Sequence, residues 1–284
     1  MRIPPNMTET VCFLGVEEKG RRLYGGTGFF VAVQEADCPD LQWAYLVTAK
    51  HCVTRAFDKY NNLFFRINQK RADAKFVPLP HHSSSRWILS EDADVAVYPM
   101  DDDATAEIQV LPLTLFLSDD IVKKEGIGLG DEVFVIGLFR EVHGRKRNFP
   151  IIRSGMIASM IDEPLQDEGT GKDYRAFLIE ARSISGLSGS PVFMALKKRG
   201  AEMHPAPRGF HAMTHQMLLV GLIRAHWDLA EKETFVDFGT NDIEKLNTGI
   251  AIVTPIQEVE KILTSEELKK QRRIDIREHQ TQHA

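Results

Sequence analysis

Three short segments carry residue types that could together perform acyl transfer. His51 follows an apolar run, Asp94 precedes Val-Ala-Val, and Ser188 lies in the glycine-bounded stretch Ser-Gly-Leu-Ser-Gly-Ser. A serine hydroxyl is a weak nucleophile until a base takes its proton. A histidine can be that base and then protonate the leaving group, while an aspartate holds the histidine in the useful tautomer. The chain order His, Asp, Ser is one in which such triads occur.

Other residues compete for two of these roles. Asp92 is the rival of Asp94, and Ser185 and Ser190 are weaker rivals of Ser188 as the nucleophile. An isolated aspartate at such a position is also typical of an ordinary turn. The stretch is not a G-x-S-x-G elbow, because Ser190 takes the last position. An α/β-hydrolase would also need Asp and then His after the serine, so the sequence argues against that class.

The same segments resemble a known enzyme family. The motifs T-A-K-H-C, D-V-A and G-L-S-G-S-P-V resemble those of trypsin/chymotrypsin-like serine peptidases, and residues 247–252 are similar to a late strand of bacterial Deg/HtrA-type members. The resemblance spans about residues 25–263, and no PDZ domain is recognised after it. It implies a triad of His51, Asp94 and Ser188. It also implies an oxyanion hole formed by the N–H groups of Gly186 and Ser188, whose neighbouring glycines leave little bulk around the nucleophile.

The elements that must position these residues are mostly short strands. Runs rich in aromatic and β-branched residues, separated by turn-forming residues, predict strands at 27–33, 41–48, 63–67, 95–98, 133–137, 176–180, 191–194 and 217–223. Short strands with few helical periods between them indicate an all-β sandwich or barrel. The resemblance implies two six-stranded antiparallel β-barrels, with the active site between them and a C-terminal helix.

Three parts of the chain follow from this pattern. We expect residues 1–115 to form an N-terminal barrel with His51 and Asp94, and residues 116–263 to form a C-terminal barrel with Ser188 and the closing helix. Thr254 is the expected N-cap of that helix, with Pro255 at its first position and Gln257 completing a capping box. Residues 264–284 are predicted to be a polar, helical or disordered tail that is frayed and solvated.

Two residues depart from the family pattern. Cys52 follows His51 where secreted relatives often have a half-cystine, and its partner would lie near Gly26, where no cysteine occurs. Leu187 replaces the aspartate that pairs with a newly cut N-terminus in zymogen-activated members. The resemblance therefore implies activity without N-terminal cleavage.

The resemblance also suggests a primary substrate pocket. Its base would be lined by the residue six before the nucleophile, which is Arg182, with Arg224 and Gly249 in the neighbouring walls. An inward-pointing Arg182 would favour an acidic residue before the scissile bond. In the alternative, Arg182 points to solvent or pairs with Glu180 and leaves a small apolar pocket.

Composition limits the other functions. The chain of 284 residues has 35 Lys and Arg against 40 Asp and Glu, a net charge of −5, which argues against a nucleic-acid partner. No apolar run reaches the roughly 18 residues of a membrane helix, and no secretory signal is recognised. We therefore expect a cytoplasmic protein with no membrane partner. Three cysteines without a C-x-x-C pair, and histidines without ligand spacing, give no metal site, and no cofactor is expected.

The predicted function is that of a serine endopeptidase acting on a protein or peptide through an acyl-enzyme, with a regulatory protein partner as a further expectation. Two alternatives remain open. One is a catalytically weak or inactive binding module on the protease fold, and the other is an esterase that uses the same triad. The presence of all three triad residue types favours an active enzyme.

Overall fold

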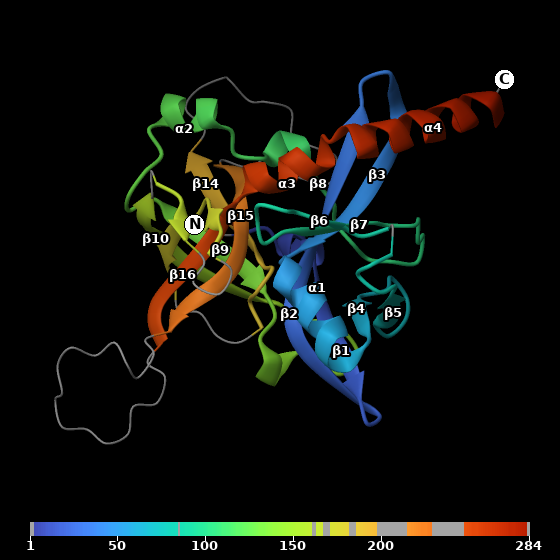
Figure 1. The fold of residues 1–284 in the computed structure, drawn as a ribbon, viewed down its shortest axis with the longest axis horizontal. Coiled ribbons are helices and arrows are strands. Elements are labelled where there is room, and N and C mark those ends of the chain that lie inside the picture. The colour runs from blue at the N-terminus through green and yellow to red at the C-terminus, as the bar shows by residue number, and fades with distance from the viewer. Residues whose placement is uncertain are drawn as a thin grey trace.

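The computed structural model describes residues 3–84, 86–160, 163–166, 171–181, 186–197, 215–228 and 247–282. Two sheet systems lie side by side, and helices α3 and α4 pass along one edge of both (Figure 1). The strands are β1 (Val11–Glu18), β2 (Arg21–Glu35), β3 (Cys38–Thr48), β4 (Leu63–Ile67), β5 (Lys75–Leu79), β6 (Ile88–Leu89), β7 (Ala96–Pro99), β8 (Leu111–Pro112), β9 (Glu132–Gly137), β10 (Ile151–Met160), β11 (Leu165–Gln166), β12 (Asp173–Tyr174), β13 (Phe177–Glu180), β14 (Pro191–Lys197), β15 (His215–Asp228) and β16 (Asn247–Pro255). The α-helices are α1 (Lys50–Tyr60), α2 (Asp119–Glu125), α3 (Ile256–Leu263) and α4 (Glu266–Gln282), and the 3-10 helices are η1 (Pro5–Thr10), η2 (Leu113–Leu115) and η3 (Arg140–Val142). No helix in the described ranges is long and apolar enough to cross a membrane.

The C-terminal half contains the predicted six-stranded barrel. Within the described residues, strands β10, β13, β16, β15, β14 and β9 pair in that order and close on themselves. Every pair is antiparallel. Three strand predictions in this half coincide with β9, β13 and β14, and a fourth lies within β15.

The N-terminal half forms a larger sheet, and a second closed barrel is not confirmed. Its eight described strands run in the order β5-β4-β1-β2-β3-β7-β6, with β8 parallel to β2. The end strands β5 and β6 do not pair with each other. Pro78 lies within β5 and has no N–H to donate, and Pro80 follows the strand. The other end strand, Ile88–Leu89, has only two residues, so neither edge offers a ladder long enough to close the sheet.

A continuous apolar core joins the two sheets. One cluster of buried side chains includes Phe29 and Val47 from the N-terminal sheet and Val135 and Phe193 from the barrel. Each fully buried side chain of this size contributes about 1.5–3 kcal/mol relative to its exposed state. Helix α3 adds Val259 to the same cluster. The relative position of the N-terminal sheet and the barrel is therefore held by the packing of this shared core.

Helix α3 is present, but its predicted cap is wrong. The helix begins at Ile256, and Pro255 precedes it in an extended conformation without a side-chain cap. Thr254 still belongs to β16, and its buried hydroxyl has no hydrogen-bond partner within the described ranges. The Gln257 amide instead donates to the Leu117 carbonyl at 3.0 Å. Strand β16 ends at Pro255, three residues beyond the late strand suggested at 247–252, which moves Thr254 out of capping position.

Residues 266–282 are helical, which is one of the two conformations expected for the tail, but they are packed against the molecule rather than frayed and solvated. They form helix α4, in which Leu268, Arg272 and Ile276 are buried at intervals of four residues. This spacing places the three side chains on one helix face.

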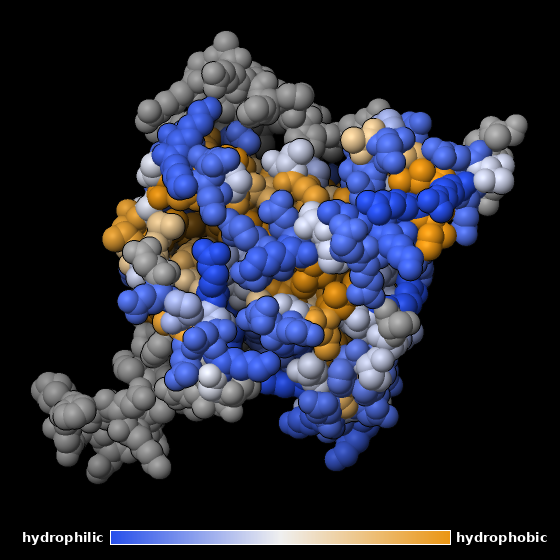
Figure 2. All heavy atoms as spheres, turned by 45° about the horizontal axis from the view of Figure 1, so that its top comes forward, coloured by the Kyte–Doolittle hydropathy of each residue, from blue (hydrophilic) through white to orange (hydrophobic). Residues whose placement is uncertain are grey.

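Hydrophilic side chains dominate the face of the molecule that Figure 2 shows, with a few apolar patches between them.

Three hydrogen bonds attach α4 to the N-terminal sheet. Arg272 donates to the Glu35 carboxylate at 2.6 Å and to the Tyr45 hydroxyl at 3.1 Å. Trp43 donates its indole N–H to the Asp275 carboxylate at 2.7 Å. A buried arginine is costly unless its donors are satisfied, and these partners satisfy it. Because α4 follows the barrel in the chain, these contacts link the C-terminal end to the first sheet.

The Arg272→Ala substitution tests this link. Loss of the guanidinium leaves Glu35 and Tyr45 without their partner, so we expect the free energy of unfolding in urea to fall by roughly 1.5–3 kcal/mol. The neighbouring Arg273 is exposed, so Arg273→Ala should change it by less than about 0.5 kcal/mol. Equal losses in the two variants would contradict the assigned role of Arg272.

Candidate active site

Helix α1, which the sequence analysis did not predict, carries His51 in its first turn. It follows β3 through Ala49, whose backbone is extended. Val53, Ala56 and Phe57 are buried at helical spacing and pack the helix onto the sheet. Asn61 ends the helix in the left-handed conformation, with φ of 54°, which asparagine tolerates better than most residues. The packed face of α1 therefore fixes where His51 projects.

His51 is held by two contacts to Asp94. Its ring Nδ1 lies 2.6 Å from Asp94 Oδ2, and its backbone N–H donates to Oδ1 at 2.9 Å. Asp94 is buried at the turn just before β7. Since one carboxylate engages both the ring and the backbone of the same residue, the imidazole has little rotational freedom. Its Nε2 faces away from Asp94.

The pKa values of His51 and Asp94 are shifted in opposite directions. Burial disfavours the imidazolium, but the neighbouring Cys52 sulfur and the Asp94 carboxylate outweigh it and raise the pKa of His51 above its ordinary value. Burial would also raise the pKa of Asp94, but the hydrogen bonds and charge of His51, helped by the charge of Arg224, lower it. The carboxylate is therefore ionised, and the shared proton belongs on Nδ1 of His51.

The loop that carries Ser188 is shaped by glycine. Gly186 and Gly189 have φ of 107° and 80°, a region that side-chain-bearing residues rarely adopt. A Cβ atom at Gly189 would collide with the Thr27 carbonyl and the Thr48 hydroxyl. Gly189 donates its N–H to the Ile223 carbonyl at 2.8 Å. The loop therefore packs closely against its neighbours at position 189, where the space and the backbone conformation require glycine.

Two backbone donors of this loop have no acceptor among the described residues. The carbonyl of Gly186 accepts from the Thr27 hydroxyl at 3.0 Å, and that of Ser188 accepts from the Thr27 N–H at 2.9 Å. The N–H groups of Gly186 and Ser188 meet no acceptor in the part of the chain that the structure describes. Unpaired donors beside a nucleophile can stabilise a developing oxyanion.

Thr27 itself, which the sequence analysis placed only in a strand, holds the loop in place. Its hydroxyl also accepts from the Leu138 N–H at 2.9 Å, and its carbonyl accepts from the Thr48 hydroxyl at 2.8 Å. The residue is completely buried. No motif around it signals this role, because its contacts to Leu138, Gly186 and Ser188 join segments more than a hundred residues apart.

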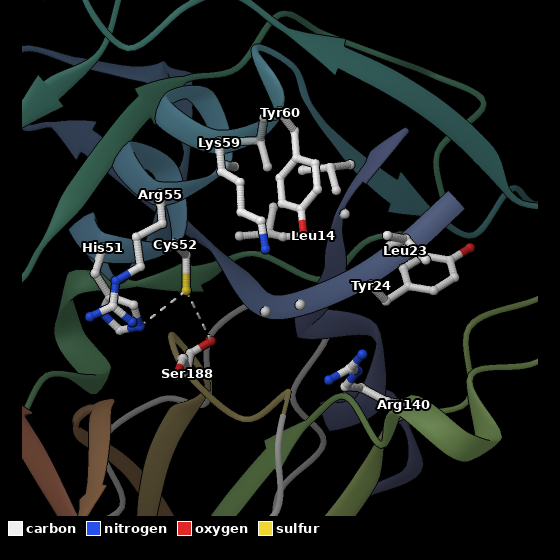
Figure 3. Close-up of a pocket in the computed structure, with 16 residues that line it drawn as sticks. Leu14, Leu23, Tyr24, His51, Cys52, Arg55, Lys59, Tyr60, Arg140 and Ser188 are labelled. Atoms are coloured by element: carbon white, nitrogen blue, oxygen red, sulfur yellow. Dashed lines mark hydrogen bonds between the residues drawn. The ribbon is translucent and has the colours of Figure 1, made fainter. Parts of the chain in front are cut away.

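Ser188 and His51 line the same two cavities. One, of about 330 Å³, lies on the side of Cys52, and the other, of about 580 Å³, lies on the side of Asp94. The Ser188 hydroxyl makes no hydrogen bond to another described residue. Cys52 Sγ lies 3.7 Å from His51 Nε2 and 3.7 Å from the Ser188 carbonyl oxygen (Figure 3).

Cys52 is a free thiol, as are the buried Cys12 and Cys38. A Cβ atom built on Gly26 would lie 3.0 Å from Cys52 Sγ. The expected neighbourhood of Cys52 and Gly26 is thus observed, with glycine where a second half-cystine would stand. Leu187 is also buried, in the apolar core, where it offers no charge to pair with an N-terminal amine.

The rival residues lie less favourably. Asp92 is exposed and lines the larger cavity, but it makes no hydrogen bond to His51. Ser190 is completely buried, and its hydroxyl has no partner among the described residues. Ser185 lies outside the described residues. The geometry therefore favours Asp94 over Asp92 and Ser188 over Ser190.

The residues expected in the primary pocket do not all meet at Ser188. Arg224 lines the larger cavity, with its guanidinium carbon 3.6 Å from the centre of the Tyr174 ring. Gly249 lines a separate cavity, where its carbonyl accepts from the Ala181 N–H at 2.8 Å. Arg182 lies outside the described residues.

The Thr27→Val substitution tests how the serine loop is anchored. Valine keeps the shape of threonine but leaves the Leu138 N–H and the Gly186 carbonyl without their buried partner. We expect the free energy of unfolding to fall by about 1–3 kcal/mol, and hydrogen exchange at the Gly189 N–H to become faster. Thr27→Ser retains the hydroxyl and should preserve protection there. Identical exchange in the two variants would remove the hydroxyl from this role.

The Asp94→Asn substitution tests the charge balance. It removes the ionised partner, so the pKa of His51 should fall toward the ordinary value of about 6.5, which an NMR titration of its ring measures. In the wild type, the His51 contribution to stability is full below that ordinary pKa and is lost as pH rises through the raised pKa. The Asp94 contribution is lost as pH falls through its lowered pKa. An unchanged His51 pKa in the variant would show that Asp94 does not set it.

Comparisons with known proteins agree with this fold. A family model described as a trypsin-like peptidase domain matches residues 26–198. The protease domain of MamO from Magnetospirillum magneticum is 14% identical, with a TM-score of 0.51 over 92% of this chain and 99% of that one. The Drosophila clip serine protease Grass, of the Toll pathway, is also 14% identical, with a TM-score of 0.51 over 93% of this chain and 70% of that one. No curated protein matches the sequence.

Proposed function

The chain belongs to the trypsin-like peptidase family, and on that premise we propose that it is a serine endopeptidase that hydrolyses peptide bonds in a protein or peptide substrate. In this proposal Ser188 is the nucleophile, His51 is the general base and acid, and Asp94 orients His51 and stabilises its charged form. The observation that carries it is the double contact of Asp94 to His51, which leaves Nε2 directed to the cavities that Ser188 also lines.

Each proposed step assigns a proton to a stated atom. Ser188 Oγ attacks the carbonyl carbon while its proton passes to His51 Nε2, and the carbonyl oxygen becomes an oxyanion beside the Gly186 and Ser188 N–H groups. His51 Nε2 then donates this proton to the leaving amine. The bond between the carbonyl carbon and the amine nitrogen breaks, the amine departs, and Ser188 remains as an acyl ester. A water molecule then attacks the ester carbonyl carbon while His51 Nε2 takes its proton. The bond from that carbon to Ser188 Oγ breaks, the carboxylic acid product leaves, and His51 returns the proton to Oγ.

The missing hydrogen bond between Ser188 and His51 is compatible with this mechanism. Catalytic hydrogen bonds are often long in free enzymes and tighten only when substrate is bound. The raised pKa of His51 has a consequence for rate, because only the neutral imidazole accepts the serine proton. The proposed activity therefore increases as pH rises toward the pKa of His51.

Two other functions use the same observations. A binding module on this fold would retain the cavities but form no acyl-enzyme. An esterase would form the acyl-enzyme from small esters but would not cleave peptides. The assembled His51–Asp94 pair favours a catalyst over a binding module, since a binding module has no need of an oriented base.

The cellular setting is proposed from the sequence. Free thiols at Cys12, Cys38 and Cys52 accord with a reducing compartment, so we keep the cytoplasm as the proposed location. Burial of Leu187 in an apolar core supports activity without N-terminal cleavage. A regulatory protein partner would then control access to the cavities rather than maturation.

Labelling with a fluorophosphonate probe tests the nucleophile. The probe phosphonylates an activated serine, so we expect the wild type to be labelled and Ser188→Ala to lose all labelling. His51→Ala should lower the labelling rate by at least about a hundredfold, because the serine then lacks its base. Ser190→Ala is the matched control and should retain labelling, since that hydroxyl is buried.

Labelling of Ser188→Ala at the wild-type rate, or no labelling of the wild type, would overturn the assignment.

Substrate choice separates the two enzyme functions. Cleavage of a denatured protein that is lost in Ser188→Ala supports the peptidase. Hydrolysis of small esters with every protein and peptide left intact would instead identify an esterase.

A further inference from the structure

The lining of the smaller cavity beside Ser188 is positively charged. Among the described residues that line it, Arg55 and Lys59 come from α1 and Arg140 comes from η3, and none is acidic. Lys59 and Arg140 reach toward the cavity from opposite sides, while Arg55 lies next to His51 (Figure 3). Three cations, with no carboxylate among the described residues of the lining, make this a place where an anion gains Coulomb energy.

The position of this cavity relative to the reaction follows from His51. Its Nδ1 faces Asp94, whereas its Nε2 lies 3.7 Å from Cys52 Sγ, which lines the smaller cavity. Nε2 is the atom that gives its proton to the leaving amine. The leaving-group part of a substrate must therefore lie on the Cys52 side. The acyl part is left with the larger cavity, which Arg224 and Ala225 of β15 line.

The walls of the smaller cavity suit a side chain with an aliphatic stem and a charged end. Leu14, Leu23 and Leu63 provide apolar surface, and Tyr24 and Tyr60 lie among the cations. The volume of about 330 Å³ corresponds to roughly eleven molecules of liquid water, enough for one or two amino-acid side chains.

Lys59 is charged at neutral pH. The Tyr60 side chain, followed by the charge of Glu18, raises the pKa of Lys59 above its ordinary value. Glu18 is therefore the acidic group that acts on this cation from outside the cavity lining. The planar guanidinium groups of the two arginines can bind a carboxylate in a bidentate manner.

We propose, on the basis of the peptidase function proposed above, that this cavity selects substrates with a glutamate or aspartate at the first or second position after the scissile bond. The carboxylate is bound among Arg55, Lys59 and Arg140, and its methylene stem lies on the leucines. This selection is separate from any preference set by residues before the bond.

Matched peptides that differ only by glutamate or glutamine at these two positions test the selection. The two side chains have nearly the same shape, so the comparison isolates the charge. The wild type should cleave the better glutamate peptide with a kcat/KM at least about tenfold above its glutamine partner, the lower range for a charge-assisted hydrogen bond. Equal rates at both positions would overturn the proposal while leaving the peptidase function intact.

Single substitutions identify the cations. In Arg55→Gln, Lys59→Gln and Arg140→Gln the glutamate-to-glutamine ratio should fall, and in the triple variant it should approach one. Lys123→Gln is the matched control, because Lys123 is exposed on α2 and lines neither cavity that contains Ser188. An undiminished ratio in the triple variant would overturn the proposal.

A binding measurement keeps the two proposals separable. Ser188→Ala is titrated with short peptides that represent the leaving-group product and carry glutamate or glutamine at their first or second residue. NMR shifts of Cys52 and Arg140 report binding. Tighter binding of the glutamate peptide supports the site even where no peptide is cleaved, and only the peptidase function then fails. Equal affinity for glutamate and glutamine peptides at both positions, or shifts remote from the cavity, would overturn the proposed site.

Discussion

The arrangement of the site depends on Thr27, a buried residue that holds one loop against two sheets. Its backbone N–H and hydroxyl bind the carbonyls of Ser188 and Gly186, and its own carbonyl accepts from Thr48 at the end of the strand that leads to His51. The two loop carbonyls turn toward Thr27, while the N–H groups of Gly186 and Ser188 meet no acceptor among the described residues. The same residue thus relates the serine loop to the helix that carries the histidine.

Charge around the serine is divided between two sides. On one side Asp94 is ionised and paired with His51, and Arg224 adds a positive charge near that pair. On the other side the lining of the smaller cavity is cationic. In the proposed reaction, a substrate that spans Ser188 would meet a different electrostatic environment before and after the bond to be cleaved. Helix α4 adds a further constraint at a distance, because its attachment to the first sheet limits relative movement of the two halves that form these cavities.

The sequence predicted the parts that depend on local pattern. Short strands follow from alternation and turn residues, and the joint order of His51, Asp94 and Ser188 identified the residues that the cavities bring together. What it missed depends on long-range contact. Helix α1 was overlooked because Val53, Ala56 and Phe57 form only one buried face of three turns, and the burial of Arg272 requires a carboxylate more than two hundred residues away. Closure of the first sheet failed for a local reason, since prolines in and after β5 remove pairing capacity.

The central claim is that Ser188 forms a covalent acyl intermediate with His51 as its base. An activated ester is mixed with the enzyme, the reaction is stopped in acid during turnover, and the acyl mass is located by peptide mass spectrometry. Cys52 is the informative competitor, because its thiol lies 3.7 Å from the same histidine nitrogen. The account predicts the acyl group on Ser188 and its disappearance in Ser188→Ala. An acyl group on Cys52, with turnover retained in Ser188→Ala, would contradict it.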